Sequence, residues 1–260
     1  MIDTHSHLLP KIDHGCPDLA TSVLMAREAA ASGIGTVVCT PHLSDWDETV
    51  VGRAGPVLEE VKAELAAAGV GLALRLGFEV DLGIAASVDT IRLSALTIEG
   101  SGGAIVLEMP YSGWPPFIQE TIFRLSTVGF VPVLAHPERN ERVQKSSELL
   151  AGCLKAGAVA QATAASLGGE FGRTAERTFY RLISEGLISL LASDAHSYRR
   201  DGWTMGPMLA ALEGRVTQED LVTLTQTNPR RLLAGKKPVP VKPADKRSLQ
   251  RGRKRHKNTR

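Results

Sequence analysis

Histidine and carboxylate side chains that could bind metal ions occur from the first residues of the chain onward. The sequence opens with Asp3-Thr4-His5-Ser6-His7, in which two histidines stand two residues apart. In an extended strand, side chains alternate between the two faces, so His5 and His7 would point in the same direction. Such a pair suits one cation. A single His-x-His is nevertheless a weak indication, because an isolated histidine is more often an ordinary polar residue.

Other residues of the same types lie at or just beyond the ends of short apolar runs. They are His14 (IDHG), His42 (CTPH), Glu79 (GFE), Glu108 (VLE), His136 (LAH), and Asp194 and His196 (ASDAH). Of the seven histidines, only His256 does not follow this pattern. Unrelated surface histidines would have no reason to avoid the predicted helices, so the pattern as a whole predicts a metal site.

The chemistry of these ligands is that of a hydrolytic metal centre. Imidazoles and carboxylates without thiolates fit Mn, Fe or Zn. The set is larger than one ion needs, and Glu79 could bridge two ions. Several cations in one pocket can bind the oxygens of a phosphate and lower the pKa of a bound water, which favours hydrolysis of phosphate esters.

The elements that must position these ligands alternate along the chain. Buried strands are predicted at residues 2–5, 34–40, 72–78, 104–108, 131–135, 158–162 and 187–193, and helical periodicity occurs at 19–30, 57–68, 117–128, 147–156 and 174–185. Seven β/α units with continuous apolar strands predict a parallel, closed or nearly closed barrel, whose chemistry belongs at the carboxyl ends of the strands. Only the sixth strand, which ends near Thr163, offers no obvious ligand.

The chain divides by charge into two parts. Residues 1–235 are predicted to form one domain with a net charge of about −8, whereas residues 236–260 contain eleven Lys or Arg and a single acid, Asp245. This basic C-terminal tail has few large apolar residues and is predicted to be disordered. It is either a solvated appendage or a contact for an acidic partner, nucleic acid or a membrane surface.

Composition and missing motifs exclude several classes of protein. No apolar run is long enough for a membrane span, and Cys16, Cys39 and Cys153 are too few and too widely spaced for a disulfide framework, so we expect a cytoplasmic protein. None of these cysteines is followed six residues later by the arginine of a cysteine phosphatase. The sequence contains no GxxxxGK[ST], GxGxxG or GxSxG, and therefore no nucleotide cofactor is expected.

Taken in order, several motifs resemble the polymerase and histidinol phosphatase (PHP) superfamily. The matching segments are DTHSHLLPKIDHG, TPH, Glu79, LEMPY, AHPER, SDAH and NPRRLL, which span residues 1 to about 233. The chain is most similar to the manganese-dependent protein-tyrosine phosphatases of bacterial capsule and exopolysaccharide systems, the CpsB type. The resemblance implies a distorted (β/α)7 TIM-like barrel of the PHP type with three divalent metal ions, most commonly Mn, with Fe or Zn as alternatives. It also implies hydrolysis of phosphotyrosine in proteins by attack of a metal-bound hydroxide.

The resemblance further assigns roles to individual residues. One ion would take His5, His7, Glu79 and Asp194, a second would take Glu79, Glu108 and His136, and a third would take His14, His42 and His196. Arg139 matches a phosphate-binding arginine, and the alternative for it is a surface ion pair with Glu138 or Glu141.

Two positions depart from the family pattern. The tyrosine phosphatases usually carry Asp-Asp-Gly where this chain has Asp13-His14-Gly15, and a second phosphate-binding arginine where this chain has Asp201. Arg199 or Arg200 is expected to replace that arginine.

The ligands alone leave other functions open. A PHP phosphatase for a small substrate, such as histidinol phosphate or a nucleotide, would use the same metals. A non-enzymatic metal-binding adaptor with a tail for nucleic acid or membrane is the second alternative. For the tyrosine phosphatase, the expected partners are a phosphotyrosyl protein and, by resemblance only, a membrane-associated tyrosine autokinase.

Overall fold

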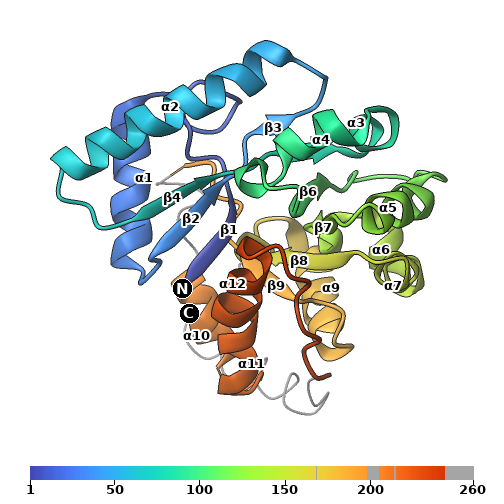
Figure 1. Ribbon diagram of the computed structural model, residues 1–260. Coiled ribbons are helices and arrows are strands. Elements are labelled where there is room, and N and C mark those ends of the chain that lie inside the picture. The colour runs from blue at the N-terminus through green and yellow to red at the C-terminus, as the bar shows by residue number, and fades with distance from the viewer. Residues whose placement is uncertain (168, 198–204, 214, 244–260) are drawn as a thin grey trace.

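The computed structural model is a ring of parallel strands surrounded by helices (Figure 1). The structure describes residues 1–167, 169–197, 205–213 and 215–243. Its strands are β1 (Ile2–Ser6), β2 (Thr36–Cys39), β3 (His42–Leu43), β4 (Ala73–Leu76), β5 (Glu79–Asp81), β6 (Ala104–Glu108), β7 (Val131–Ala135), β8 (Val159–Thr163) and β9 (Leu190–Ala192).

The nine strands correspond to the seven strands that the sequence predicts, because two of the predicted strands are each divided in two. The ladders are β1-β2-β4 and β3-β5-β6-β7-β8-β9, with every pair parallel. β3 continues β2 beyond Pro41, and β5 continues β4 beyond Gly77, so the predicted second and third strands are each interrupted once. An isolated bridge between Ser6, at the end of β1, and Ala195, just after β9, closes the ring. The predicted α/β fold, a distorted (β/α)7 barrel, is confirmed.

Helices follow the strands and cover the outside of the ring (Figure 1). They are α1 (Leu19–Ala31), α2 (Glu48–Ala67), α3 (Leu82–Ser87), α4 (Thr90–Leu96), η1 (Ile98–Gly100), α5 (Ile118–Thr127), η2 (Pro137–Arg139), α6 (Glu141–Lys145), α7 (Glu148–Lys155), α8 (Ala164–Leu167), α9 (Gly172–Ser184), α10 (Met205–Leu212), α11 (Gln218–Val222), η3 (Thr223–Thr227) and α12 (Asn228–Leu233).

One helix begins well before its predicted start. α2 includes residues 48–56 because the side chain of Asp47 accepts hydrogen bonds from the backbone N–H groups of Thr49 and Val50, which caps the helix early. Pro56 therefore lies inside the helix rather than before it. The periodicity from residue 57 onward shows only the part of α2 that follows this proline.

A proline also lies inside the central strand β7, where it would normally interrupt a ladder. Pro132 pairs with Ile105 of β6, but the ladder to β8 begins one residue later, with Val133 opposite Val159. Pro132, which has no backbone N–H, therefore lies before the first residue pair between β7 and β8 and leaves no hydrogen bond of that ladder unmade. This local geometry lets the wholly buried run VPVLA form a strand, as predicted.

The chain remains on the barrel beyond its last helix. The Asn228 amide donates to the Val239 carbonyl and accepts from the Val239 N–H, and Val241 is buried. The first eight residues of the predicted tail, 236–243, thus contact the body, and residues 244–260 lie outside the described part of the chain. The division at residue 235 stays a prediction. Within the described residues, no helix is both long and apolar enough to cross a membrane.

Candidate metal centre

Four of the predicted ligands form a buried group at the centre of the ring. His5 and His7 come from β1 and the residue after it, Glu79 starts β5, and Asp194 follows β9. The His5 Nε2 atom lies 3.1 Å from Glu79 Oε2 and 3.3 Å from Asp194 Oδ1. The His7 Nε2 atom lies 3.4 Å and 3.1 Å from the same two oxygens. The structure thus brings together the residues predicted for the first ion.

A second group shares the Oε2 atom of Glu79 with the first. His42 Nδ1 lies 3.1 Å from Glu79 Oε2 and 3.4 Å from Glu108 Oε2. His136, which the resemblance places with Glu79 and Glu108, instead lies on the other oxygen of Glu79, with Nε2 2.9 Å from Oε1. The carboxylate of Glu79 therefore lies between several imidazoles, as expected for a bridging ligand.

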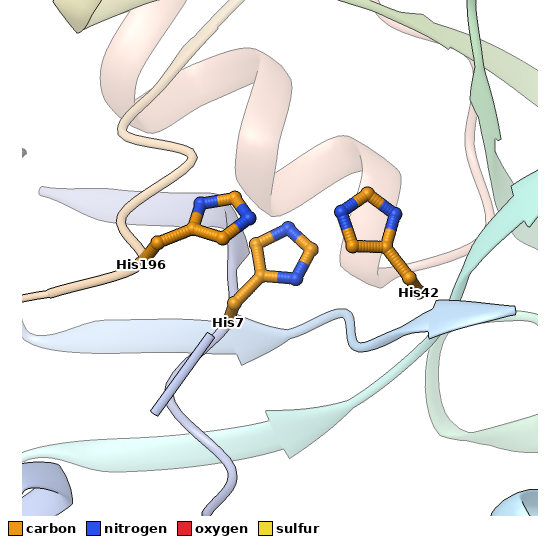
Figure 2. Close-up of side chains that lie close together, drawn as sticks. All are labelled: His7, His42 and His196. Carbon is orange, nitrogen blue, oxygen red and sulfur yellow. The ribbon is translucent and has the colours of Figure 1, made fainter. Parts of the chain in front are cut away.

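A third group consists of imidazoles alone. The rings of His7, His42 and His196 converge in Figure 2, with 3.9 Å between the ring centroids of His7 and His196 and 4.4 Å between those of His7 and His42. His14, which is exposed, lies beside this group, 4.8 Å from His42 and 5.0 Å from His196 between ring centroids. All nine predicted ligands thus meet at one end of the barrel, with His14 at its outer edge.

The backbone is strained at two of these ligands. Among the described residues, four non-glycine residues have a positive φ, and His136 (φ 39°) and Asp194 (φ 57°) are two of them. Such conformations cost about 1–3 kcal/mol and persist where surrounding contacts enforce them. At Asp194 the N–H donates to the His5 carbonyl, which fixes the turn after β9 against β1.

Divalent cations fit these groups. Around an ion with bonds of about 2.1 Å, adjacent ligand atoms are about 3.0–3.4 Å apart, and the separations of 3.1 to 3.4 Å among the carboxylate and imidazole atoms match that spacing. His42 Nδ1 and Asp194 Oδ1 are buried without a hydrogen-bond partner. Atoms that coordinate a cation are in this state, because the ion takes the place of a hydrogen-bond donor or of a proton.

The pKa shifts of the cluster show that its buried carboxylates favour positive charge around them. Burial raises the pKa of Glu79, but the charge of His5 and hydrogen bonds from His136 outweigh it and hold the pKa well below its usual range. Burial lowers the pKa of His7, yet the hydrogen bond to Asp13 and the close carboxylate of Asp194 hold it well above its usual range. The carboxylates thus remain ionised and recruit protons when no metal is bound, and metal binding would release those protons.

The pKa of His196 shifts in the opposite direction to that of His7. Burial and then the neighbouring charge of His7 lower the pKa of His196 to about 4, although Asp194 opposes them. Its Nδ1–H donates to the Asp194 carbonyl at 2.9 Å, so Nε2 keeps a free lone pair. His196 is therefore neutral near pH 7, the form in which a histidine binds a metal.

Two supporting residues escaped the sequence analysis. Asp13 accepts a hydrogen bond from His7 Nδ1 at 2.6 Å, which leaves His7 Nε2 available to a cation. It also accepts from the backbone N–H groups of Gly15 and His42. Its position in the motif IDHG was visible in the sequence, but a carboxylate that orients a histidine cannot be distinguished there from one that binds metal.

The second supporting residue comes from the strand without a ligand. Gln161 of β8 is fully buried, and its amide lies 2.8 Å from His5 Nδ1 and 2.8 Å from the Thr4 hydroxyl. The Gln161 Nε2 atom faces His5 Nδ1, and the Oε1 atom accepts from the Thr4 hydroxyl. The oxygen and nitrogen of an amide have nearly the same shape, and flipping the Gln161 amide lets His5 Nδ1–H donate to Oε1, which leaves His5 Nε2 free to bind metal. A polar residue inside the apolar run AVAQA was the signal for this role.

Arg139 lies beside the metal ligands rather than on the surface. Its guanidinium is nearly buried, pairs with Asp194 Oδ2 at 2.8 Å and donates to the Thr163 hydroxyl at 2.8 Å. Burial lowers the pKa of Arg139, but the negative charges of Asp194 and Glu138 outweigh burial and raise the pKa above its usual value, so the guanidinium stays cationic. The predicted alternative of a surface ion pair is therefore wrong. Arg199 and Arg200, the other predicted phosphate ligands, lie outside the described residues.

Comparison with known proteins places this arrangement in a family. The sequence profile described as "Capsular polysaccharide synthesis, CpsB/CapC" matches residues 1–234. The chain belongs to the CpsB/CapC family. A tyrosine-protein phosphatase of Bacillus subtilis, YwqE, is 31% identical over 229 residues, which cover 87% of this chain and 89% of that one.

Solved structures agree with the family at the level of fold. One from work on YwqE of Bacillus subtilis and CpsB of Streptococcus pneumoniae, described as unique metal-dependent tyrosine phosphatases, superposes with a TM-score of 0.81. The sequences are 27% identical, and the match covers 94% of this chain and 98% of the chain in that structure. An organophosphorus hydrolase of Deinococcus radiodurans, with a TM-score of 0.56 and 18% identity over 89% of this chain and 92% of its own, shares the fold.

Proposed function

We propose that this protein is a metal-dependent protein-tyrosine phosphatase of capsular or exopolysaccharide synthesis. The observation that carries the proposal is the set of three overlapping ligand groups beside a buried arginine at the mouth of an open pocket. Family membership supports the same activity, since the similar proteins are described as tyrosine phosphatases.

The pocket above the cluster suits a phosphate ester. It has a volume of about 550 Å³ and is lined by Arg139, Asp194 and His196 together with Tyr111, Ala165, Glu170 and Phe171. Divalent ions bound in the groups would neutralise phosphoryl charge and lower the pKa of water. Arg139, fixed by Asp194 and Thr163, would hold the oxygens of the phosphoryl group with its planar fork of N–H donors.

The finer assignments of the site belong to the same proposal. We assign three divalent ions with manganese as the favoured metal, because the donors are imidazole and carboxylate without thiolate. His5, His7, Glu79 and Asp194 would hold the first ion, and Glu79, Glu108 and His136 the second. His14, His42 and His196 would hold the third, because the only nitrogen of His7 that is free of Asp13 already faces the other ligands of the first ion. Arg199 and Arg200 stay candidates for a second phosphate contact.

The cellular context also follows by inference. We expect a cytoplasmic protein, since Cys16, Cys39 and Cys153 are all buried and unpaired, as in a reducing compartment. The substrates would be phosphotyrosyl proteins of capsule synthesis, among them a membrane-associated tyrosine autokinase. The eleven basic residues of 236–260 would favour an acidic partner.

Steady-state kinetics on the full chain loaded with Mn²⁺ test the activity. We expect kcat/KM for a phosphotyrosyl peptide to exceed the values for histidinol phosphate and for a nucleoside monophosphate. A strong preference for either small substrate would overturn the assignment in favour of another PHP phosphatase. If the loaded protein released no phosphate from any of the three, a non-enzymatic role would replace it.

Arg139→Lys separates phosphate binding from metal binding. The variant keeps the positive charge but loses the bidentate fork, so we expect turnover of the peptide to fall about tenfold or more while the metal content stays the same. Unchanged turnover would remove Arg139 from the proposed site.

A further inference from the structure

Two aromatic side chains remain unexplained by metal binding. Tyr111, in the loop after β6, is 56% exposed, and Phe171, just before α9, is 41% exposed. Both line the pocket that contains Arg139, Asp194 and His196. Aromatic side chains that share a pocket with a few convergent polar groups are typical of a ligand-binding site.

The loop that carries Tyr111 is held in one position. Asn140 donates its side-chain amide to the carbonyls of Pro110 and Gly113, at 2.7 and 3.1 Å. Glu141 donates its backbone N–H to the Tyr111 carbonyl and accepts from the Gly113 N–H. The Tyr111 ring lies parallel to that of His136, with 6.2 Å between centroids. Tyr111 is thus positioned before any substrate binds.

Phe171 is tied to the same segment from the other direction. The Arg139 guanidinium carbon lies 3.5 Å from the centroid of the Phe171 ring, a cation–π contact. Glu138 is fully buried and accepts hydrogen bonds from Thr163 and Ser166, which fixes the short helix α8 shortly before Phe171. The segment from Glu138 to Glu141 therefore organises Arg139 and both aromatic residues together.

We propose that Tyr111 and Phe171 determine specificity by binding the aromatic ring of an aryl phosphate. The inference rests on the proposed function. It assigns recognition of the aromatic ring of the substrate to these two side chains. A phosphate held by Arg139 and the metal cluster would place its ester substituent next to both aromatic faces. The rigid ring of phosphotyrosine can stack there, whereas the short alkyl chain of phosphoserine offers no face to stack on.

Binding of non-hydrolysable ligands tests this proposal directly. The dissociation constants of phenylphosphonate, butylphosphonate and inorganic phosphate are measured by calorimetry on the full chain loaded with Mn²⁺. For Tyr111→Ala and Phe171→Ala we expect phenylphosphonate to bind about three- to tenfold more weakly, and the other two ligands within about twofold of wild type. Phe123→Ala, which removes an exposed aromatic residue of α5 outside the pocket, is the matched control.

The pattern across the three ligands decides the outcome. Equal weakening of all three ligands would show that Tyr111 and Phe171, which both contact Arg139, only position that arginine. Unchanged phenylphosphonate binding would show that the phenyl ring lies elsewhere. Either result overturns the proposal. Tyr111→Leu and Phe171→Leu retain apolar volume if an alanine variant unfolds, and they should lose the same selectivity. Because binding is measured without turnover, an inactive protein that still prefers phenylphosphonate would contradict only the proposed function.

Discussion

The ligands on the floor of the cluster and those at its rim are supported in different ways. On the floor, His5, His7 and Glu79 are fully buried, and Asp194 is nearly so. At the rim, the side chains of His42, His196 and Glu108 are 14%, 23% and 24% exposed, and His14 is exposed. The floor is thus enclosed by protein, whereas the rim opens toward the pocket.

The supporting contacts differ most between the floor and His14. Three of the four floor ligands have a supporting partner, with Gln161 on His5, Asp13 on His7 and Arg139 on Asp194. At the rim, His196 is oriented by the Asp194 carbonyl. Among the described residues, the contacts of His14 are ring contacts with neighbouring imidazoles. A buried carboxylate without a cation is costly, so floor positions should tolerate little change and rim positions more. Such tolerance would let the chain carry His14 where the resemblance to the tyrosine phosphatases predicts aspartate.

The largest expected effect is loss of a floor ligand. His5→Ala should lower kcat/KM for a phosphotyrosyl peptide by about 10³-fold or more, because it removes a proposed ligand of the first ion and a positive partner of Glu79 and Asp194. His14→Ala, the matched change at the rim, should cost about tenfold or less. Elemental analysis of both variants shows whether metal content falls in parallel. Equal losses would remove the distinction between floor and rim.

Removal of the metals should affect stability as well as activity. Treatment with a chelator is expected to abolish turnover and to lower Tm, because the floor carboxylates lose the cations that bind only the folded state. Mn²⁺ should restore both properties. Differential scanning calorimetry before and after chelation provides the measurement, and an unchanged Tm would mean that the cluster is held together without metal.

Loss of a supporting residue on the floor should have an intermediate effect. Asp13→Asn and Gln161→Leu each disturb the orientation or tautomer of one histidine and should weaken metal binding about 10- to 100-fold. Competition with a metal-sensitive chelating dye measures this affinity. Gln119→Leu, at an exposed position of α5, makes the same chemical change away from the site and should bind metal as wild type does. Wild-type affinity in Asp13→Asn and Gln161→Leu would contradict their supporting role.

Replacement of the rim residue His14 by aspartate should alter the preference for one metal over another more than the rate of turnover. His14→Asp introduces the residue that the resemblance to the tyrosine phosphatases predicts here, and kcat with Mn²⁺ should stay within about threefold of wild type because the position is exposed. The ratio of activity with Mn²⁺ to that with Zn²⁺ should rise, since carboxylates favour the harder ion. An inactive variant would instead show that His14 is a required ligand.

The smallest effect is expected outside both regions. A chain that ends at residue 243 should hydrolyse a small aryl phosphate at the wild-type rate, because the floor, rim and pocket residues remain. Ending the chain at residue 236 should lower Tm, since it removes Val241 and the partner of Asn228. Thermal melts and initial rates of the two truncated chains make the comparison. Slower turnover by the chain that ends at residue 243 would show that the remaining tail contributes to catalysis.

Local patterns predicted much of the fold and most of the candidate ligands. The runs at 104–108 and 131–135 form strands with the predicted bounds, because continuous apolar residues suit strands that are covered on both faces. The second and third strands break at Pro41 and Gly77, which the apolar pattern alone did not reveal. The supporting roles of Asp13 and Gln161 were also missed, because they depend on contacts with histidines.

By itself, the sequence determined which side chains stand at the strand ends and what chemistry they favour. Residue types and their periodicity are local, and they can be read along the chain. Only the tertiary structure decided how the ligands group, since His5 and Glu79 are 74 positions apart and meet only when the ring closes. It also placed His42 with Glu79 and Glu108, and Arg139 against Asp194. These contacts depend on strand register and turn geometry, which many distant residues fix together.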